Sequence, residues 1–152
     1  MIGLFLGSTD FPKIILEKLK KKKVKYFLID LTKNNVFKKD TNCNFINIGK
    51  FGKILDLIKK KKCKKVLFAG KIDKPKIINL KLDLKGIYYL PRIIKTFKLG
   101  DAAILKELIK ILAENKVNVI KSNCFNPELT LPKGNFGKNK PNKHDLVDIQ
   151  KG

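Results

Sequence analysis

Small and hydroxyl-bearing residues follow two short apolar runs of this 152-residue chain. The triplet Gly7-Ser8-Thr9 comes after the run Ile2 to Leu6, and Gly70 and Lys71 come after the run Lys65 to Ala69. Backbone N–H groups at a helix start favour negative charge, and an ammonium group is a point-charge partner for phosphate. These positions therefore predict a site for a diphosphate-bearing ligand. A plain strand-to-helix turn with a threonine cap explains the triplet equally well.

A third cluster, Gly100-Asp101, opens the clearest predicted helix of the chain, because apolar residues recur after it at helical spacing. Asp101 is expected to be the N-cap of this helix. The alternative role of Asp101 is that of a ligand for a metal ion or a water molecule in phosphoryl chemistry. His144, the only histidine, stands beside Asp145 in a polar tail, where we expect solvation rather than catalysis.

A dinucleotide site of the NAD type is not indicated. Such a site requires G-x-G-x-x-G after the first strand and an acidic residue about 20 positions further on. Asp30 stands where that acid would be, but the second and third glycines are missing after Gly7.

Predicted strands alternate with helical segments, and this order specifies a parallel sheet with right-handed crossovers. The expected fold is therefore an α/β, Rossmann-like open sheet, mostly parallel, with helices on both faces. Because the carboxyl ends of parallel strands meet at one edge, the clusters described above are expected to face one crevice. The predicted strands are Ile2 to Leu6, Val24 to Ile29, Phe45 to Ile48, Lys65 to Ala69 and Val117 to Ile120.

Two predicted helices end in lysine quartets, Lys20 to Lys23 and Lys59 to Lys62. These quartets meet the negative ends of the helix dipoles and are expected at the pole opposite the strand carboxyl ends. Thr9 or Asp10 is expected to cap the first of these helices, and the second is expected to start near Gly49. The other predicted helices are Gly86 to Lys98 with a break or kink at Pro91, the helix opened by Asp101, and a short helix over Asp145 to Gln150.

Lysine carries almost all of the formal charge of +22, because Arg92 is the only arginine. Guanidinium groups read bases and clamp phosphates in bidentate fashion, so this charge is weak support for nucleic-acid binding, and an AT-rich coding bias is the simpler interpretation. Widely spaced cysteines without a C-x-x-C pair predict neither a disulfide framework nor a zinc site. No apolar run approaches the roughly 20 residues that cross a bilayer. We expect a soluble cytoplasmic protein that can touch an anionic inner-membrane surface.

Short motifs containing glycine, proline and lysine recur through the chain in a fixed order. They are Gly3-Leu4-Phe5-Leu6-Gly7 with Pro12, Gly49-Lys50-Phe51-Gly52-Lys53, Phe68-Ala69-Gly70-Lys71 with Lys74-Pro75, Leu90-Pro91, Gly100-Asp101 with Ala103 and Leu105, and Thr130-Leu131-Pro132-Lys133-Gly134 with Gly137. In this order they resemble the amino-terminal domain of the LpxI family, the UDP-2,3-diacylglucosamine pyrophosphatases of lipid A biosynthesis. The resemblance covers almost the whole chain. Ser8 and Thr9 stand where the family commonly has a glycine run, Ala102 where a second acid is frequent, and Lys74 where arginine is typical.

The resemblance implies hydrolysis of UDP-2,3-diacylglucosamine to UMP and 2,3-diacylglucosamine 1-phosphate, assisted by Mg2+, at the cytoplasmic face of a Gram-negative inner membrane. It implies that Asp101 is a candidate catalytic residue, while the main catalytic aspartate belongs to a second, carboxyl-terminal domain. The residues expected to bind the substrate are Gly7, Ser8, Thr9, Gly70, Lys71, Lys74, Gly100 and Thr130.

The expected organisation is a Rossmann-like LpxI N-terminal domain over residues 1–132, followed at 133–152 by a linker and the start of an interdomain helix. The second domain does not follow in this sequence, so we expect little or no turnover from the chain alone. A separate polypeptide could supply that domain.

Two other function classes were weighed. Gly7-Ser8-Thr9-Asp10-Phe11 also resembles the opening of formyltransferases that use a folate donor, but those enzymes need an Asn and His pair with a following Asp, and no histidine precedes His144. A basic nucleic-acid-binding module is the other alternative. It predicts an affinity that falls steeply with salt, and the lack of arginine and of interleaved aromatic residues argues against it.

Overall fold

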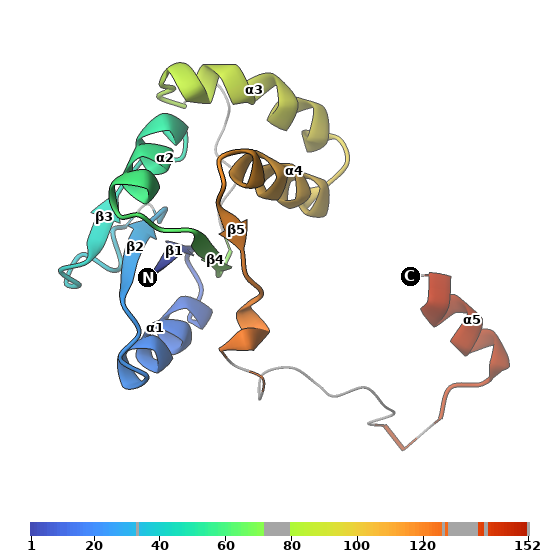
Figure 1. Ribbon diagram of the computed structural model, residues 1–152. Coiled ribbons are helices and arrows are strands. Elements are labelled where there is room, and N and C mark those ends of the chain that lie inside the picture. The colour runs from blue at the N-terminus through green and yellow to red at the C-terminus, as the bar shows by residue number, and fades with distance from the viewer. Residues whose placement is uncertain (33, 72–79, 126, 128–136, 139, 152) are drawn as a thin grey trace.

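The computed structural model describes residues 1–32, 34–71, 80–125, 127, 137–138 and 140–151. Its centre is a parallel sheet with the strand order β3-β2-β1-β4-β5 (Figure 1). This order places β1 in the middle and changes direction between β1 and β4, as in Rossmann-like folds. The predicted fold class is confirmed. The strands are β1 (Ile2–Leu6), β2 (Tyr26–Asp30), β3 (Cys43–Phe45), β4 (Lys65–Ala69) and β5 (Asn118–Val119).

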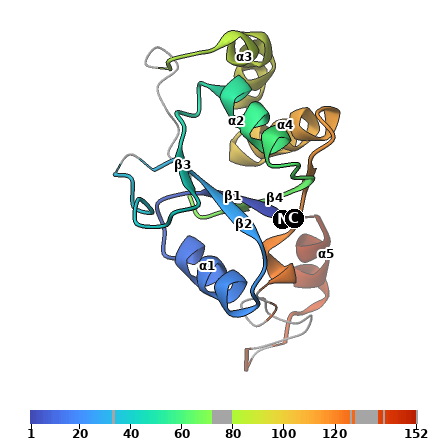
Figure 2. The same cartoon turned by 60° about the vertical axis from the view of Figure 1, so that its left-hand side comes forward.

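Helices cover both faces of the sheet. The helix α1 (Phe11–Lys21) packs Ile15 and Leu19 against one face, while α2 (Phe51–Lys60) and α4 (Asp101–Glu114) pack Ile54 and Leu112 against the other. Every residue of β1 is buried, which explains why this strand is continuously apolar. The helix α3 (Leu84–Phe97) lies outside the layer of α2 and α4, at the edge of the molecule (Figures 1 and 2).

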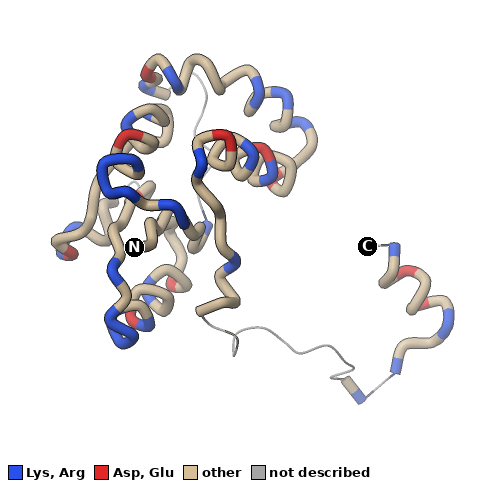
Figure 3. Tube along the Cα trace, in the orientation of Figure 1, with Lys and Arg blue, Asp and Glu red and all other residues tan. Residues whose placement is uncertain are grey.

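The helices α1, α2 and α4 end in the same hydrogen-bonded motif. At the end of α4, Lys116 has φ of 60° and the N–H of Val117 donates to the Leu112 carbonyl at 2.9 Å. Lys23 and Lys62 are also left-handed, with φ of 52° and 50°. This is the Schellman motif, in which a buried apolar residue follows the left-handed position. The lysine quartets therefore end α1 and α2, as predicted, and Figure 3 shows their blue runs at those helix ends.

The same motif corrects two strand boundaries. Val24 was predicted to begin a strand, but its N–H closes α1 on the Leu19 carbonyl at 3.0 Å, so β2 begins at Tyr26. Val117 likewise belongs to the end of α4, and β5 is shorter than predicted.

The third strand also differs from the prediction of Phe45 to Ile48. It spans Cys43–Phe45 instead, because a turn at Asn47 ends the extended segment. In this turn the Asn47 side-chain oxygen accepts the N–H of Gly49 at 2.9 Å, and the Asn47 carbonyl accepts the N–H of Lys50 at 2.8 Å. Lys50 is then the N-cap of α2.

The remaining elements follow the sequence with small changes. The helix α3 continues through Pro91, so the predicted break does not end it. A short 3-10 turn (Ser122–Cys124) follows β5, and α5 (Lys143–Lys151) is present where a short helix was predicted. The linker predicted to begin at residue 133 lies partly outside the described residues. The three cysteines are free, and no helix among the described residues is long and apolar enough to span a membrane.

Candidate functional site

The loops that follow β1 and β4 lie side by side at the change of strand order. The N–H of Gly7 donates to the Ala69 carbonyl at 2.8 Å, and the N–H of Ser8 donates to the Lys71 carbonyl at 2.9 Å. The Ser8 hydroxyl donates to the same carbonyl at 3.3 Å. The structure thus brings together Gly7, Ser8 and Lys71, three of the residues predicted to bind the substrate.

Two glycines permit this contact between the loops. A Cβ at Gly7 would collide with the Lys71 backbone, and a Cβ at Gly70 would lie 2.8 Å from Thr9 Oγ1. Gly70 also has a φ of 84°, which L side chains rarely adopt. Gly7 is therefore needed here for backbone packing, and its N–H and that of Ser8 are used within the fold rather than facing an anion.

A cavity of about 370 Å3 opens beside Gly70 and Lys71, at the carboxyl end of β4. Its walls come from α2, α3 and α4, and they are almost wholly apolar. Among the residues that the structure describes, Asp101 and Lys71 are the charged residues in the lining. The apolar lining includes Phe68, Tyr89, Leu90, Ile93, Ile104 and Leu108.

The predicted site residues therefore fall into groups. Gly70, Lys71 and Asp101 line the cavity, while the loop of Gly7 and Ser8 lies next to it through its bonds to Lys71. Gly100 is exposed at the start of α4 with a φ of 91°, beside Asp101 rather than among the lining residues. Lys74 and Thr130 lie outside the described residues.

Asp101 does not have the local role that was predicted for it. Gly100 is the N-cap of α4, and Asp101 is the first residue of the helix. An acid in the first turn is stabilised by the positive end of the helix dipole. Thr9 and Asp10 were the two predicted caps of α1, and Asp10 is the residue at the N-cap position. Its side chain makes no capping hydrogen bond and pairs with Lys13 at 2.7 Å instead.

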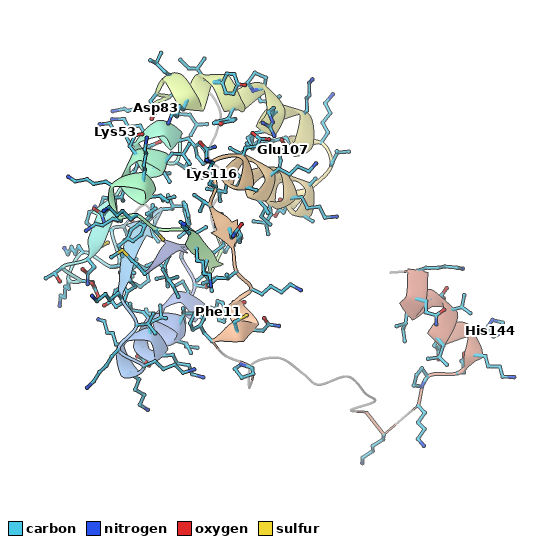
Figure 4. The ribbon with its side chains drawn as sticks, in the orientation of Figure 1. Phe11, Lys53, Asp83, Glu107, Lys116 and His144 are labelled. Atoms are coloured by element: carbon cyan, nitrogen blue, oxygen red, sulfur yellow. The ribbon has the colours of Figure 1, made fainter. Side chains whose placement is uncertain are left out.

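One carboxylate positions two of the helices around the cavity. Asp83 accepts the N–H of Gly86 at 2.8 Å as the N-cap of α3, and it also accepts N–H groups of Gly52 and Lys53 in the first turn of α2, both at 3.0 Å. Burial opposes ionisation of Asp83, but these N–H bonds and the Lys53 charge outweigh it and hold the pKa of Asp83 below its ordinary value. Figure 4 shows Asp83 beside Lys53 where α2 and α3 begin.

Arg92 joins α3 to α4, the other pair of helices that line the cavity. Its guanidinium donates to Glu107 at 2.7 Å and to both carboxylate oxygens of Glu114 at 2.7 and 2.8 Å. These hydrogen bonds raise the pKa of Arg92 and lower that of Glu114. The only arginine of the chain is therefore a structural clamp.

The described residues do not form a magnesium site by themselves. They contain no group of three or more His, Cys, Asp or Glu side chains that could hold a metal ion, and Asp101 is the only acid among the described residues of the cavity lining. Magnesium prefers an octahedral set of oxygen ligands, commonly one or two carboxylates together with phosphates and waters. One carboxylate does not meet that requirement, so we derive no step through a metal.

The two other titratable residues singled out in the sequence have structural surroundings. Asp30 is buried at the end of β2, and its carboxylate accepts the N–H groups of Thr32 at 2.8 Å and Phe37 at 3.1 Å. Both oxygens of this carboxylate are therefore used to hold the following loop, although Asp30 stands where a ribose-binding acid would be. His144 is exposed in α5, away from the cavity (Figure 4).

The sequence interpretation missed the apolar walls of the cavity. The helical spacing of apolar residues predicts the helices α3 and α4, but it does not indicate the open space that Ile93, Ile104 and Leu108 line. A signal was present in α3, where the apolar residues span too wide an arc of the helix for all of them to face the sheet.

Comparison with known proteins identifies the family of this chain. The family model described as the LpxI N-terminal domain matches residues 1–129. The chain belongs to the LpxI N-terminal domain family. The family predicted from the sequence is thereby confirmed, and every residue that lines the cavity falls within the matched part of this LpxI domain.

A curated relative supports the same assignment. The UDP-2,3-diacylglucosamine pyrophosphatase LpxI of Caulobacter vibrioides is 31% identical over 106 residues, which cover 70% of this chain and 38% of the relative. The chain thus matches well under half of the length of that relative.

Proposed function

We propose that this LpxI N-terminal domain binds UDP-2,3-diacylglucosamine and forms one wall of the active site of an LpxI-type pyrophosphatase. The observation that carries the proposal is the apolar cavity with the charged residues Lys71 and Asp101 in its lining. A lipid nucleotide has the matching chemistry, namely long apolar chains beside a diphosphate. The printed name of the Caulobacter vibrioides relative supports this substrate.

The cavity suits the apolar part of such a ligand. Its volume of about 370 Å3 falls at the lower end of the roughly 300 to 1,000 Å3 typical of ligand sites. Phe68, Ile93, Ile104 and Leu108 offer carbon surface without hydrogen-bonding groups. We place an acyl chain there, since burying apolar surface is favourable and the lining gives polar groups few partners.

The diphosphate is placed at the β4 end of the cavity, where the Lys71 ammonium can offset its charge. In the proposed reaction, water attacks one phosphorus atom, the bridging P–O bond breaks, and UMP and 2,3-diacylglucosamine 1-phosphate leave. Positioning and charge stabilisation dominate such phosphoryl chemistry. The role proposed for this chain is to position the substrate, with Gly7, Ser8 and Thr9 supporting the Lys71 loop.

We assign residues 1–132 to this domain and 133–152 to a linker and the start of an interdomain helix. The attacking water is proposed to be activated by an aspartate of a second domain, with Mg2+ held mainly by that domain and by the substrate. Asp101 remains the candidate in this chain to contact either of them. The protein is proposed to act at the cytoplasmic face of an inner membrane.

The proposal is tested by binding to the 152-residue chain, using calorimetric titration with UDP-2,3-diacylglucosamine and with UDP-N-acetylglucosamine, which lacks the long acyl chains. Ile93→Phe fills the cavity and is expected to weaken binding of the acylated ligand by about tenfold, since it displaces roughly two methylene groups. Ile94→Phe is the matched control, because Ile94 is 42% exposed and outside the lining.

Equal affinities for the two ligands, or equal effects of the two substitutions, would contradict the acyl assignment. A separate assay measures release of UMP by the chain alone and is expected to show little or none. Rapid hydrolysis by the chain would contradict the need for a second domain.

A further inference from the structure

The helix α3 is apolar on both of its sides. Its inner side contributes Tyr89, Leu90, Ile93 and Phe97 to the cavity. Its outer side carries apolar residues that the remainder of the described chain leaves uncovered. Their exposed fractions are 87% for Leu84, 56% for Ile87, 71% for Tyr88 and 42% for Ile94.

These outer residues recur at helical spacing and form one stripe. The helix α3 itself lies at the outer edge of the molecule, with α2 and α4 on its inner side in both views (Figures 1 and 2). Leu99, which is 73% exposed in the turn to α4, extends the apolar surface. A contiguous exposed apolar surface of this kind marks an interaction site, so we expect this face to have a partner.

The charges around the stripe have one sign. Lys85, Lys95 and Lys98 are exposed beside it, and no acidic residue occurs between Leu84 and Lys98. Four acids from neighbouring segments contact α3: Asp83 caps its start, Glu107 and Glu114 bind Arg92, and Asp56 lies 3.6 Å from Lys85 in an exposed pair. Figure 3 shows α3 marked only by blue after its first residue, whereas α4 carries both signs.

We propose that the outer face of α3 lies in the surface of an anionic bilayer. Apolar side chains flanked by lysines are the pattern of interfacial helices, in which the apolar face enters the boundary between headgroups and acyl chains. Tyr88 suits that boundary, since its ring is apolar and its hydroxyl can remain in water. Lysine is depleted in protein–protein interfaces, so the three flanking lysines favour lipid headgroups over a protein partner.

The position of the cavity gives this contact a use, and here the inference rests on the proposed function. A single helix separates the outer stripe from the cavity lining at Leu90 and Ile93. An acyl chain that leaves the bilayer beside α3 would therefore reach the cavity after a short path with little exposure to water. The bilayer contact itself requires neither the substrate nor its hydrolysis.

A chain with a formal charge of +22 is also expected to bind anionic vesicles nonspecifically. The test must therefore separate α3 from the lysine quartets at the ends of α1 and α2. Vesicles of phosphatidylcholine with phosphatidylglycerol are sedimented with the 152-residue chain, and the partition coefficient is measured. The double variant Leu84→Ser and Ile87→Ser is expected to reduce it about tenfold, through loss of inserted apolar surface.

The matched control removes exposed apolar residues elsewhere. Ile14 and Val36 are 38% and 50% exposed, and replacing both with Ser is expected to change the partition coefficient less than twofold. A charge control compares Lys85→Gln and Lys95→Gln with Lys22→Gln and Lys61→Gln, which remove the same charge from α3 and from the quartets. The α3 pair is expected to cause the larger loss.

Insertion is read directly from fluorescence, because the chain has no tryptophan. Leu84→Trp is expected to shift its emission to the blue on vesicle binding and to be quenched by brominated lipids, whereas Ile14→Trp on α1 is expected to do neither. Equal losses from the matched variants, an unshifted Leu84→Trp in bound protein, or absence of vesicle binding would overturn the inference. These vesicles contain no UDP-2,3-diacylglucosamine. Failure of the bilayer contact is therefore distinguishable from failure of the proposed function, which the substrate titration tests separately.

Discussion

Asp83 and Gly52 are 31 positions apart, yet the Asp83 Oδ1 atom accepts the Gly52 N–H at 3.0 Å. The same oxygen accepts the N–H of Gly86 at 2.8 Å, so one carboxylate serves the starts of α2 and α3. Helix starts have N–H groups without partners inside the helix, and a capping carboxylate satisfies them. The contact between the starts of α2 and α3 in the cavity wall therefore depends on this side chain.

Replacing Asp83 with Ala is expected to lower the free energy of unfolding by about 2 kcal/mol, because two helix starts lose caps that are each typically worth about 1 kcal/mol. Urea unfolding followed by circular dichroism measures this. Asp56→Ala is the matched control, because the Asp56 side chain is 72% exposed, and it is expected to change stability by about 0.5 kcal/mol or less. Similar losses for both variants would show that Asp83 does not link the helices.

The Asp83 carboxylate also predicts a pH dependence of stability. Its folded-state pKa is below its ordinary value, with burial opposed by the N–H bonds of Gly86, Gly52 and Lys53. The stabilisation is therefore fully present above the unfolded-state pKa of about 3.9 and is lost as pH falls through the lower folded-state pKa. Asp83→Asn cannot ionise, so the stability difference between wild type and this variant should shrink as pH falls below about 4. A difference that stays constant down to pH 2 would contradict the assigned charge effect.

Much of the sheet could be predicted from sequence, because its strands are short apolar runs that stop at small residues. The run Ile2 to Leu6 is buried along its whole length, and the clusters after β1 and β4 do meet. The boundaries that failed depend on local hydrogen bonds. Val24 and Val117 are apolar enough for strands, but each closes a Schellman motif at the end of a helix.

The cavity could not be predicted, because it depends on tertiary contacts between distant residues. Nothing in the local sequence links Asp83 to Gly52, and the clamp between Arg92 and Glu114 spans 22 positions. The pattern of α3 indicates too much apolar surface for one core, but it does not say which side is lined by a cavity. The loop of Gly7 illustrates the same limit, since the residue that approaches its backbone is Lys71.

Two glycine substitutions separate close packing from backbone strain. Gly7→Ala places a methyl group against the Lys71 carbonyl, and overpacking of this kind is expected to cost about 2 to 3 kcal/mol. Gly100→Ala meets nothing within 4 Å but must adopt a φ of 91°, so it is expected to cost about 1 to 2 kcal/mol. Urea unfolding of both variants measures which substitution lowers the free energy of unfolding more. A smaller cost at Gly7 would mean that the two loops separate easily.

The left-handed lysine at the end of α4 predicts a stabilising substitution. Lys116 has a φ of 60° at the position where glycine is usual, so Lys116→Gly relieves strain and is expected to raise the free energy of unfolding by about 0.5 to 1 kcal/mol. Lys106→Gly removes the same charge from an exposed position inside α4, where it is expected to lower stability by about 1 kcal/mol. Thermal and urea unfolding measure both. Opposite signs are the expected result, because the same residue change relieves strain at one site and weakens a helix at the other, and a loss of stability at Lys116 would contradict the left-handed conformation.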